Sequence, residues 1–239
     1  MITRVEVVAR RGPGGRTVLP VLRASGQLAV RRTGPTSIHL VATAFGPLGG
    51  DDAEVFLVVE EGARLTVHSV AAAVALPARE RDRSSVQRVH ATVAGALVLA
   101  PEPTVVTARA HHRAELTVEL AEGATLDATE QVLLGRAGEE PGRWTGTTRV
   151  ERAGRPLLHT TISLGPGAPA WLPPVAPRAY ATRLSVGGAA PGRTLPVATG
   201  QDAVRLPLDG GWSATAWGAE LHRVVRALET LTTTAEEVA

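Results

Sequence analysis

The feature that most constrains the fold is a strand–turn–strand unit that occurs twice between residues 55 and 126. Residues 55–59 form an apolar run in which Val55, Leu57 and Val59 share one face, and Leu65 and Val67 continue this spacing of two after a break at 60–64. A matching unit occupies residues 116–126. A period of two is typical of a β-strand with one buried face, so both units predict paired strands joined by a tight turn.

Three glycines mark the turns of this repeat. Gly62, Gly95 and Gly123 each precede a leucine by two or three residues, and they are 33 and 28 residues apart. We expect each glycine to supply a positive φ angle that other residues adopt only with strain. No amphipathic helix of useful length separates the units. The sequence therefore predicts a mostly-β fold of helical or stacked β-coils, or of several packed sheets, and not alternating strands and helices.

The C-terminal end changes to a helical period. Apolar residues are spaced by four and three at Trp217, Leu221, Val224, Leu228 and Leu231. This stripe predicts one amphipathic helix, with Ser213 or Thr215 as its N-cap. The favoured interpretation is that the helix packs on its own sheet; the alternative is that it faces a partner protein.

Prolines divide the chain into three parts. Residues 1–165 form a predicted β-rich body, and five prolines follow between 166 and 177. Proline fixes φ and lacks an amide donor, so residues 166–178 predict an extended connector. Residues 179–239 then predict C-terminal strands and the amphipathic helix.

Missing residue types exclude several kinds of chemistry. The chain has no cysteine, and all 25 of its basic residues are arginine. Disulfides, thiol nucleophiles and cysteine-ligated zinc are therefore excluded, as are a Walker A lysine and a Schiff base. The net charge of +2 does not indicate a nucleic-acid-binding protein. We find no apolar run long enough to span a membrane and no signal-peptide pattern, and we expect a cytoplasmic protein.

The seven histidines do not show the spacing of a closed metal site. His111 and His112 are adjacent in a predicted strand, so their rings should point to opposite faces. The others, at positions 39, 68, 90, 159 and 222, form no HxH or HxxxH pattern. A dedicated zinc or nickel site is not expected. A transient site made from one histidine and a carboxylate stays open.

No catalytic set is visible in the sequence. The glycine-rich segment 10–16 predicts a hairpin turn more than a phosphate cradle, because no helix follows it. There is no GxSxG motif. The carboxylate pairs at 51–52, 60–61 and 139–140 lie beside glycines, where solvated turn residues are usual. We therefore expect a protein that presents surfaces and is not an enzyme.

Six motifs occur in a fixed order between Gly26 and Leu164. They are GQLAVRR at 26–32, GPLGGD at 46–51, EGARLTV at 61–67, ALVLAPEPT at 96–104, EQVLLGRAGE at 130–139 and RVERAGRPLL at 149–158. Their order and spacing resemble those of the urease accessory protein UreD family, also called UreH, in an actinobacterial form. The resemblance weakens beyond Gly165.

This resemblance implies a right-handed helical β-fold with C-terminal helices, and a non-catalytic scaffold. In that family UreD binds UreF, which recruits the GTPase UreG, and the hetero-oligomer docks on apo-urease for nickel insertion. A water-filled passage through UreD is the proposed nickel route, with no tightly bound cofactor.

Three acidic residues match the family motifs and are candidate residues of the nickel passage. They are Asp51, Glu130 and Glu139, whose oxygen atoms would hold nickel loosely enough for it to move on. The alternative is that Asp51 and Glu139 cap turns, and that Arg136 pairs with one of these acids. The competing function is a β-helical carbohydrate-active enzyme or binding protein. That function needs an aromatic-lined cleft with two carboxylates roughly 5–10 Å apart.

Overall fold

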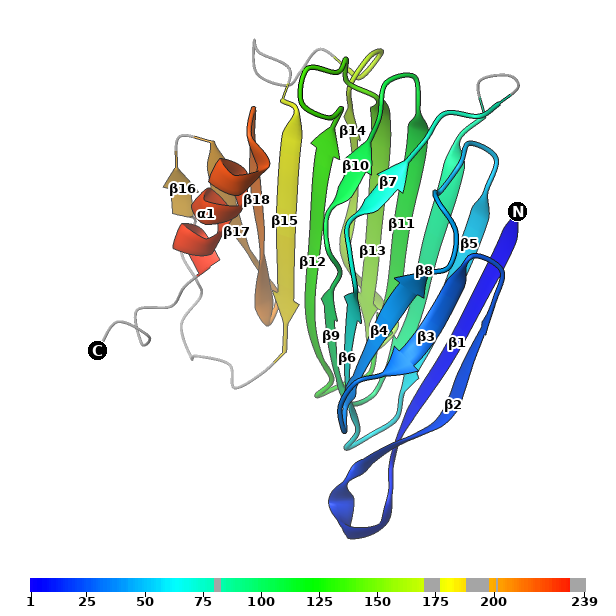
Figure 1. Ribbon diagram of the computed structural model, residues 1–239. Helices are drawn as coiled ribbons and strands as arrows, with labels where there is room; N and C mark the ends of the chain where they lie inside the picture. Colours follow the sequence, from blue (N-terminus) through cyan, green and yellow to red (C-terminus); the bar gives the residue numbers. More distant parts are fainter. Residues whose placement is uncertain (80–82, 170–176, 188–197, 201, 233–239) are drawn as a thin grey trace.

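The computed structural model describes residues 1–79, 83–169, 177–187, 198–200 and 202–232, and shows two large β-sheets packed face to face with one helix beside the second sheet (Figure 1). In the first sheet the described strands follow the order β14 (Arg155–Leu164), β13 (Arg143–Arg152), β11 (His111–Leu120), β8 (Ser85–Val93), β5 (Asp52–Val59), β1 (Ile2–Arg11) and β2 (Thr17–Ser25). The five central strands of this sheet, from β13 to β1, are parallel.

The second sheet has a parallel centre and an antiparallel extension. Its order is β16 (Ala198–Gly200), β17 (Ala203–Leu208), β18 (Gly211–Gly218), β15 (Ala179–Val186), β12 (Thr125–Leu134), β9 (Ala96–Ala100), β6 (Arg64–Ser69), β4 (Ser37–Ala42) and β3 (Leu28–Arg32). The short strands β7 (Ala73–Ala75) and β10 (Thr104–Val106) join it through β12. Strands β4, β6, β9 and β12 are parallel to one another, whereas β15, β17 and β18 pair antiparallel.

The chain reaches this arrangement by winding in coils. It passes from the first sheet to the second and then through a short third strand, as β5–β6–β7 and again as β8–β9–β10, before β11 and β12 begin a third coil. Equivalent residues stack in register, as Leu65 pairs with Leu97 and Leu97 with Leu126. The prediction of a mostly-β fold of stacked coils is therefore confirmed.

Two of the three repeat glycines have the expected backbone conformation, and the third does not. Gly62 has a φ of 71° and Gly123 has a φ of 76°. The prediction for Gly95 is wrong, because its φ is not in the left-handed region. A Cβ atom on Gly95 would lie 2.2 Å from the carbonyl oxygen of Ala63. Gly95 is required because the turns of successive coils approach closely here.

The main core lies between the two sheets. Inward residues of β1, β5, β6 and β9, among them Val55, Leu57, Leu65 and Leu97, are almost completely buried. A second cluster contains Trp144, Leu164 and Tyr180. The alternation seen in the sequence therefore corresponds to one buried face on each sheet.

The C-terminal helix begins later than the sequence predicted. Helix α1 spans Leu221–Thr232, whereas Ser213, Thr215 and Trp217 lie in β18, so the predicted N-caps are wrong. Trp217 of β18 lies four residues before Leu221 of α1, so the two residues fit the spacing of one helical stripe although they belong to different elements. This coincidence explains why the sequence predicts an earlier start for the helix. Val224 and Leu228 of α1 are buried against β15, β17 and β18. The prediction that the helix packs on its own sheet is confirmed.

Two loop predictions have different outcomes. The segment 10–16 is a hairpin turn that connects β1 to β2 through the short 3-10 turn Pro13–Gly15, as predicted. The predicted connector 166–178 lies between the end of β14 and the start of β15, but its residues 170–176 are outside the described residues. In the described part of the chain, no helix has the length and apolar character needed to cross a membrane.

Candidate functional site: an internal cavity around Glu130

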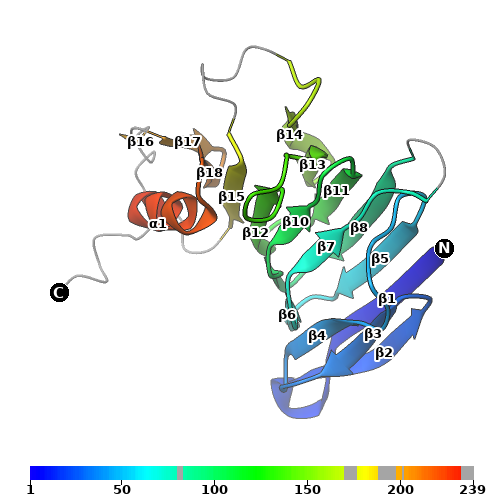
Figure 2. The same ribbon diagram turned by 45° about the horizontal axis from the view of Figure 1, so that its top comes forward.

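A cavity of about 280 Å³ lies between the two sheets. Its lining includes residues of β12 and β15 in the second sheet and of β11, β13 and β14 in the first sheet. Figure 2 shows how these strands are arranged. Most of the lining is apolar, as at Val55, Leu116 and Leu184. The polar residues of the lining include Gln87, Glu130, Thr148, Thr160, Tyr180, Thr182, Ser213 and Thr215.

Glu130 points into this cavity because of its position in β12. Ala128 and Val132, two residues before and after it, are buried on the inner face of the strand, and Glu130 shares that face. Burial raises the pKa of the Glu130 carboxyl to about 7. No ion pair of Glu130 occurs among the described residues. A carboxyl group in this environment is half-protonated near neutral pH, and its charge lacks a cationic partner.

Tyr180 and hydroxyl groups form the polar side of the cavity near Glu130. Burial and the charge of Glu130 raise the pKa of the Tyr180 phenol well above its usual value, although hydrogen bonds with Thr215 and Thr182 act in the opposite direction. The Thr182 hydroxyl donates to the Ala214 carbonyl at 2.9 Å. The cavity therefore offers hydroxyl oxygens and the half-buried carboxyl group of Glu130 within a largely apolar wall.

Asp51 lies immediately before β5, and its carboxylate is bound by several donors. Its carboxylate accepts hydrogen bonds from the N-terminal ammonium group and from the Leu48 amide, and its residue is only 9% exposed. Burial disfavours the charged form, but the ammonium group, the Leu48 amide and Gln27 together hold the pKa of Asp51 below its usual value. Asp51 thus caps a turn and is not the solvated residue that its glycine neighbours suggested.

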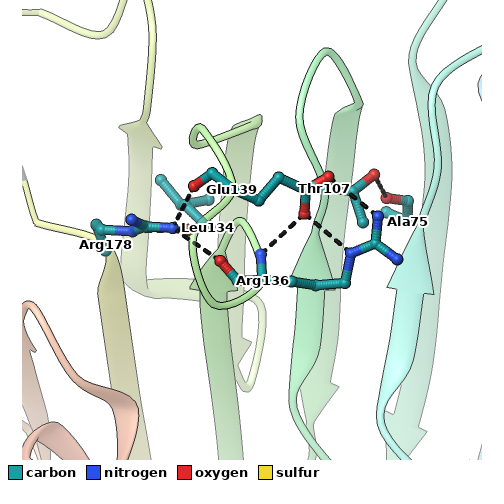
Figure 3. Close-up of polar contacts among 6 residues, drawn as sticks. All are labelled: Ala75, Thr107, Leu134, Arg136, Glu139 and Arg178. Atoms are coloured by element: carbon teal, nitrogen blue, oxygen red, sulfur yellow. Dashed lines mark hydrogen bonds and ion pairs between the residues drawn. The ribbon is translucent and has the colours of Figure 1, made fainter.

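Glu139 caps the turn between β12 and β13 (Figure 3). Its carboxylate accepts hydrogen bonds from the Arg136 amide at 2.9 Å and from the Arg136 guanidinium at 3.0 and 3.1 Å. These bonds lower the pKa of Glu139 to about 2. The pairing of Arg136 with an acid, which the sequence left as an alternative, is present.

Arg178 fixes the same turn from the side of β15. Its guanidinium donates to the carbonyl oxygens of Leu134, Arg136 and Glu139, the last at 2.7 Å (Figure 3). The sequence does not predict the role of Arg178, because only the pairing of β12 with β15 brings this residue to the turn.

Replacing Arg178 by methionine is expected to lower the free energy of unfolding by about 2 kcal/mol or more. The substitution keeps the aliphatic stem but leaves the partly buried carbonyl groups of Leu134 and Glu139 without their charged donor. Urea denaturation followed by circular dichroism measures this loss. Arg16→Met, at an exposed hairpin position, is the matched control and should change stability by less than about 0.5 kcal/mol. Equal effects in the two variants would contradict the prediction.

The three predicted passage residues do not form one closed metal site. Glu130 faces the cavity, whereas Asp51 and Glu139 lie in turns that precede β5 and β13. Within the described ranges, no group of three or more histidine, aspartate or glutamate side chains is arranged to hold a metal ion.

The two adjacent histidines face opposite sides of β11, as predicted. His112 is 2% exposed, and its Nδ1 atom is 2.9 Å from the Ser85 hydroxyl. Burial, and secondarily the charge of His111, lowers the pKa of His112 to about 4. His112 is therefore neutral near pH 7 and belongs to the packed interior.

The carbohydrate alternative gains no support from the cavity. Tyr180 is the one aromatic residue in its lining as far as the described residues go. The second carboxylate of the lining, Glu115, pairs with Arg88 and Arg113. An aromatic-lined cleft with two free carboxylates is not what these residues form.

Comparison with known proteins gives a consistent family. The profile of the family described as UreD urease accessory protein matches residues 3–238. "Urease accessory protein UreD 1" of Saccharopolyspora erythraea is 40% identical over 171 residues, which cover 68% of this chain and 66% of that protein. "Urease accessory protein UreD" of Streptomyces coelicolor is 40% identical over 169 residues, covering 69% of this chain and 66% of the relative. "Urease accessory protein UreD 3" of Streptomyces griseus is 41% identical over 179 residues, covering 71% and 70%.

The match thus spans just under two thirds of the length of the first two of these relatives. The family match itself extends over nearly all of the present sequence, and the helical β-fold agrees with what the six motifs implied. The chain belongs to the UreD urease accessory protein family.

Proposed function

We propose that this chain is a non-catalytic accessory protein of urease maturation. In this proposal it is a cytoplasmic scaffold that acts in a complex with UreF, the GTPase UreG and apo-urease while nickel is incorporated. Support comes from the family match over residues 3–238 and from relatives that are named urease accessory proteins.

The single observation that carries a more specific role is the carboxyl group of Glu130 inside the cavity, which has no ion pair with any residue that the structure describes. A buried carboxyl without a cationic partner destabilises a fold, and residues of this kind are typical of functional sites. A divalent cation beside Glu130 would stabilise the charged carboxylate that burial disfavours. Hydroxyl and carboxylate oxygens bind such ions more loosely than a set of imidazoles or thiolates does. We therefore propose the cavity as a passage for nickel, with Glu130 as its central residue.

Asp51 and Glu139 belong to this proposal as outer residues. Both are held by cationic partners, the N-terminal ammonium group and Arg136 respectively. A passing cation would have to displace that partner before it reached either carboxylate. We therefore expect Asp51 and Glu139 to matter less for nickel transfer than Glu130.

Urease activation in cells tests the passage. With limiting nickel, Glu130→Gln is expected to reduce activation at least tenfold, because glutamine keeps the shape of the side chain but removes the charge. Glu139→Gln is the matched carboxylate variant and should reduce activation less. Co-purification of each variant with UreF reports whether the scaffold is intact.

Two outcomes separate the parts of the proposal. Wild-type activation by Glu130→Gln at limiting nickel would contradict the passage and leave the scaffold role standing. Failure of the wild-type chain to form a complex with co-expressed UreF would contradict the scaffold role itself.

A further inference from the structure

We propose that His39 and His68 form a two-imidazole binding site for a late first-row divalent transition metal on the outer face of the second sheet. This site lies on the opposite side of the sheet from the cavity, and it goes beyond the proposed function and does not depend on it.

The two histidines come together through strand register. His39 in β4 pairs with His68 in β6, and directly paired residues of neighbouring strands share a face. Ile38 and Val67, which precede them, are buried in the core, so both imidazoles point outward. Their ring centroids are 5.1 Å apart and the planes differ by 31°.

This geometry suits two ligands of one metal ion. Imidazole nitrogens lie about 2.0–2.1 Å from zinc, so two such atoms on neighbouring coordination positions are about 3 Å apart. The two rings, with centroids 5.1 Å apart, are near enough for one ion to contact a nitrogen of each. Both residues are half-buried, which leaves one side of the pair open to water for the remaining ligands.

Hydrogen bonds to the other ring nitrogens prepare the pair for a metal. The Nδ1 atom of His68 is 3.2 Å from the Ala100 carbonyl oxygen, which only accepts, so a bond there requires the proton on Nδ1. The lone pair of His68 is then on Nε2. The Nδ1 atom of His39 is 2.8 Å from the Thr33 hydroxyl, whose oxygen can accept a hydrogen bond from that nitrogen in the same way. Metal-binding histidines commonly donate their second ring nitrogen to a carbonyl or similar oxygen.

The chemistry of the site selects the class of metal. Neutral imidazole favours copper, nickel and zinc over magnesium and calcium, which prefer oxygen. Arg31 pairs with His39 across β3 and β4, and its positive charge weakens cation binding. With two protein ligands and this neighbour, binding is weak and exchangeable. We expect Cu²⁺ to bind more tightly than Ni²⁺ or Zn²⁺, and Mg²⁺ not to compete.

Titration of the untagged full chain with Cu²⁺, Ni²⁺, Zn²⁺ and Mg²⁺ tests the site, together with the electron paramagnetic resonance spectrum of the Cu²⁺ form. The expected spectrum shows nitrogen coupling from two imidazoles. His39→Ala and His68→Ala should each weaken Cu²⁺ binding at least tenfold and reduce the coupling to one nitrogen. Thr33→Val, which removes the positioning hydroxyl, should weaken binding about tenfold. Arg31→Gln should strengthen it several-fold at low salt.

Control variants make the result specific. His159→Ala and His222→Ala remove histidines from other strands and from the helix, and should leave affinity and spectrum unchanged. Glu130→Gln should also leave the two-nitrogen spectrum unchanged, which separates this site from the proposed passage. Thermal unfolding confirms that each variant is folded.

Three results would overturn the proposal. They are the absence of any Cu²⁺ binding to the wild-type chain up to about 1 mM, a spectrum with fewer than two imidazole nitrogens, or unchanged binding in the folded double variant His39→Ala/His68→Ala.

Discussion

Replacing Glu130 by glutamine is expected to raise the free energy of unfolding by roughly 3 kcal/mol at pH 8 and to change it little below pH 4.5. In the folded chain burial raises the pKa of this carboxyl from 4.5 to about 7. Between these two values the folded state holds a proton that the unfolded state has released, so the stability of the wild-type chain falls as the pH rises. Glutamine has no proton to lose and removes this fall.

The measurement is the difference in unfolding free energy between Glu130→Gln and wild type, taken by urea denaturation from pH 4 to pH 8. The comparison with wild type is needed because the stability contributed by His112 depends on pH in the opposite direction. Burial lowers the pKa of His112 from 6.5 to about 4, so its contribution to stability grows as the pH rises through this range. The wild-type profile alone therefore hides both effects. Glu115→Gln, which removes a carboxylate paired with arginines, is the control and should not become more stable at high pH. A pH-independent difference for Glu130→Gln would show that this carboxyl is not desolvated.

Gly95→Ala is expected to destabilise the chain by about 4 kcal/mol or more, and Gly123→Ala by only about 1–2 kcal/mol. A Cβ atom at position 95 would overlap the carbonyl oxygens of Ala63 and Glu60, at 2.2 and 2.6 Å. Neither oxygen can move without shifting the turn of the preceding coil. At Gly123 no atom lies within 4 Å of the new Cβ, and only the φ of 76° opposes the substitution.

Urea denaturation of the two alanine variants gives this comparison directly, since both positions lie in equivalent turns of the repeat. Limited proteolysis adds a second readout, because a displaced turn at position 95 exposes the neighbouring strands. Equal losses of stability would mean that contact between coils is not what requires glycine at this position.

The sequence predicts the parts of this fold that depend on neighbouring residues. The apolar run at 55–59 and the alternation within 116–126 predict strands and their buried faces, and the repeat of glycine turns predicts stacked coils. The prediction is wrong where a strand pattern is followed closely by a helical pattern. Trp217 is consistent with both a strand and a helix, and the pairing of β18 with β15 places it in the strand.

The candidate sites were less predictable because they depend on contacts between distant strands. The family motif identifies Glu130 as a candidate, but its raised pKa follows from the sheet that covers it. The spacing rules for metal sites consider residues within one segment, whereas His39 and His68 lie in different strands and meet only through their register. In the same way, Ser85 meets His112 only because β8 and β11 pair. Register between parallel strands carries no local signal, which is why these pairs were missed.

The coiled path of the chain has a consequence for how the protein folds. In the parallel centre of both sheets, each strand bonds to its counterpart in the next coil, and the hairpins β1–β2, β3–β4 and β13–β14 lie outside the three coils. Pairing two strands of successive coils closes a long loop of chain, which costs conformational entropy before the new contacts compensate for it. A fold built from such distant contacts has a high contact order and is expected to fold slowly. Until the next coil closes, the last parallel strand is an unpaired edge that other chains can join. Accumulation of the protein in cells should therefore depend on how quickly this edge is covered.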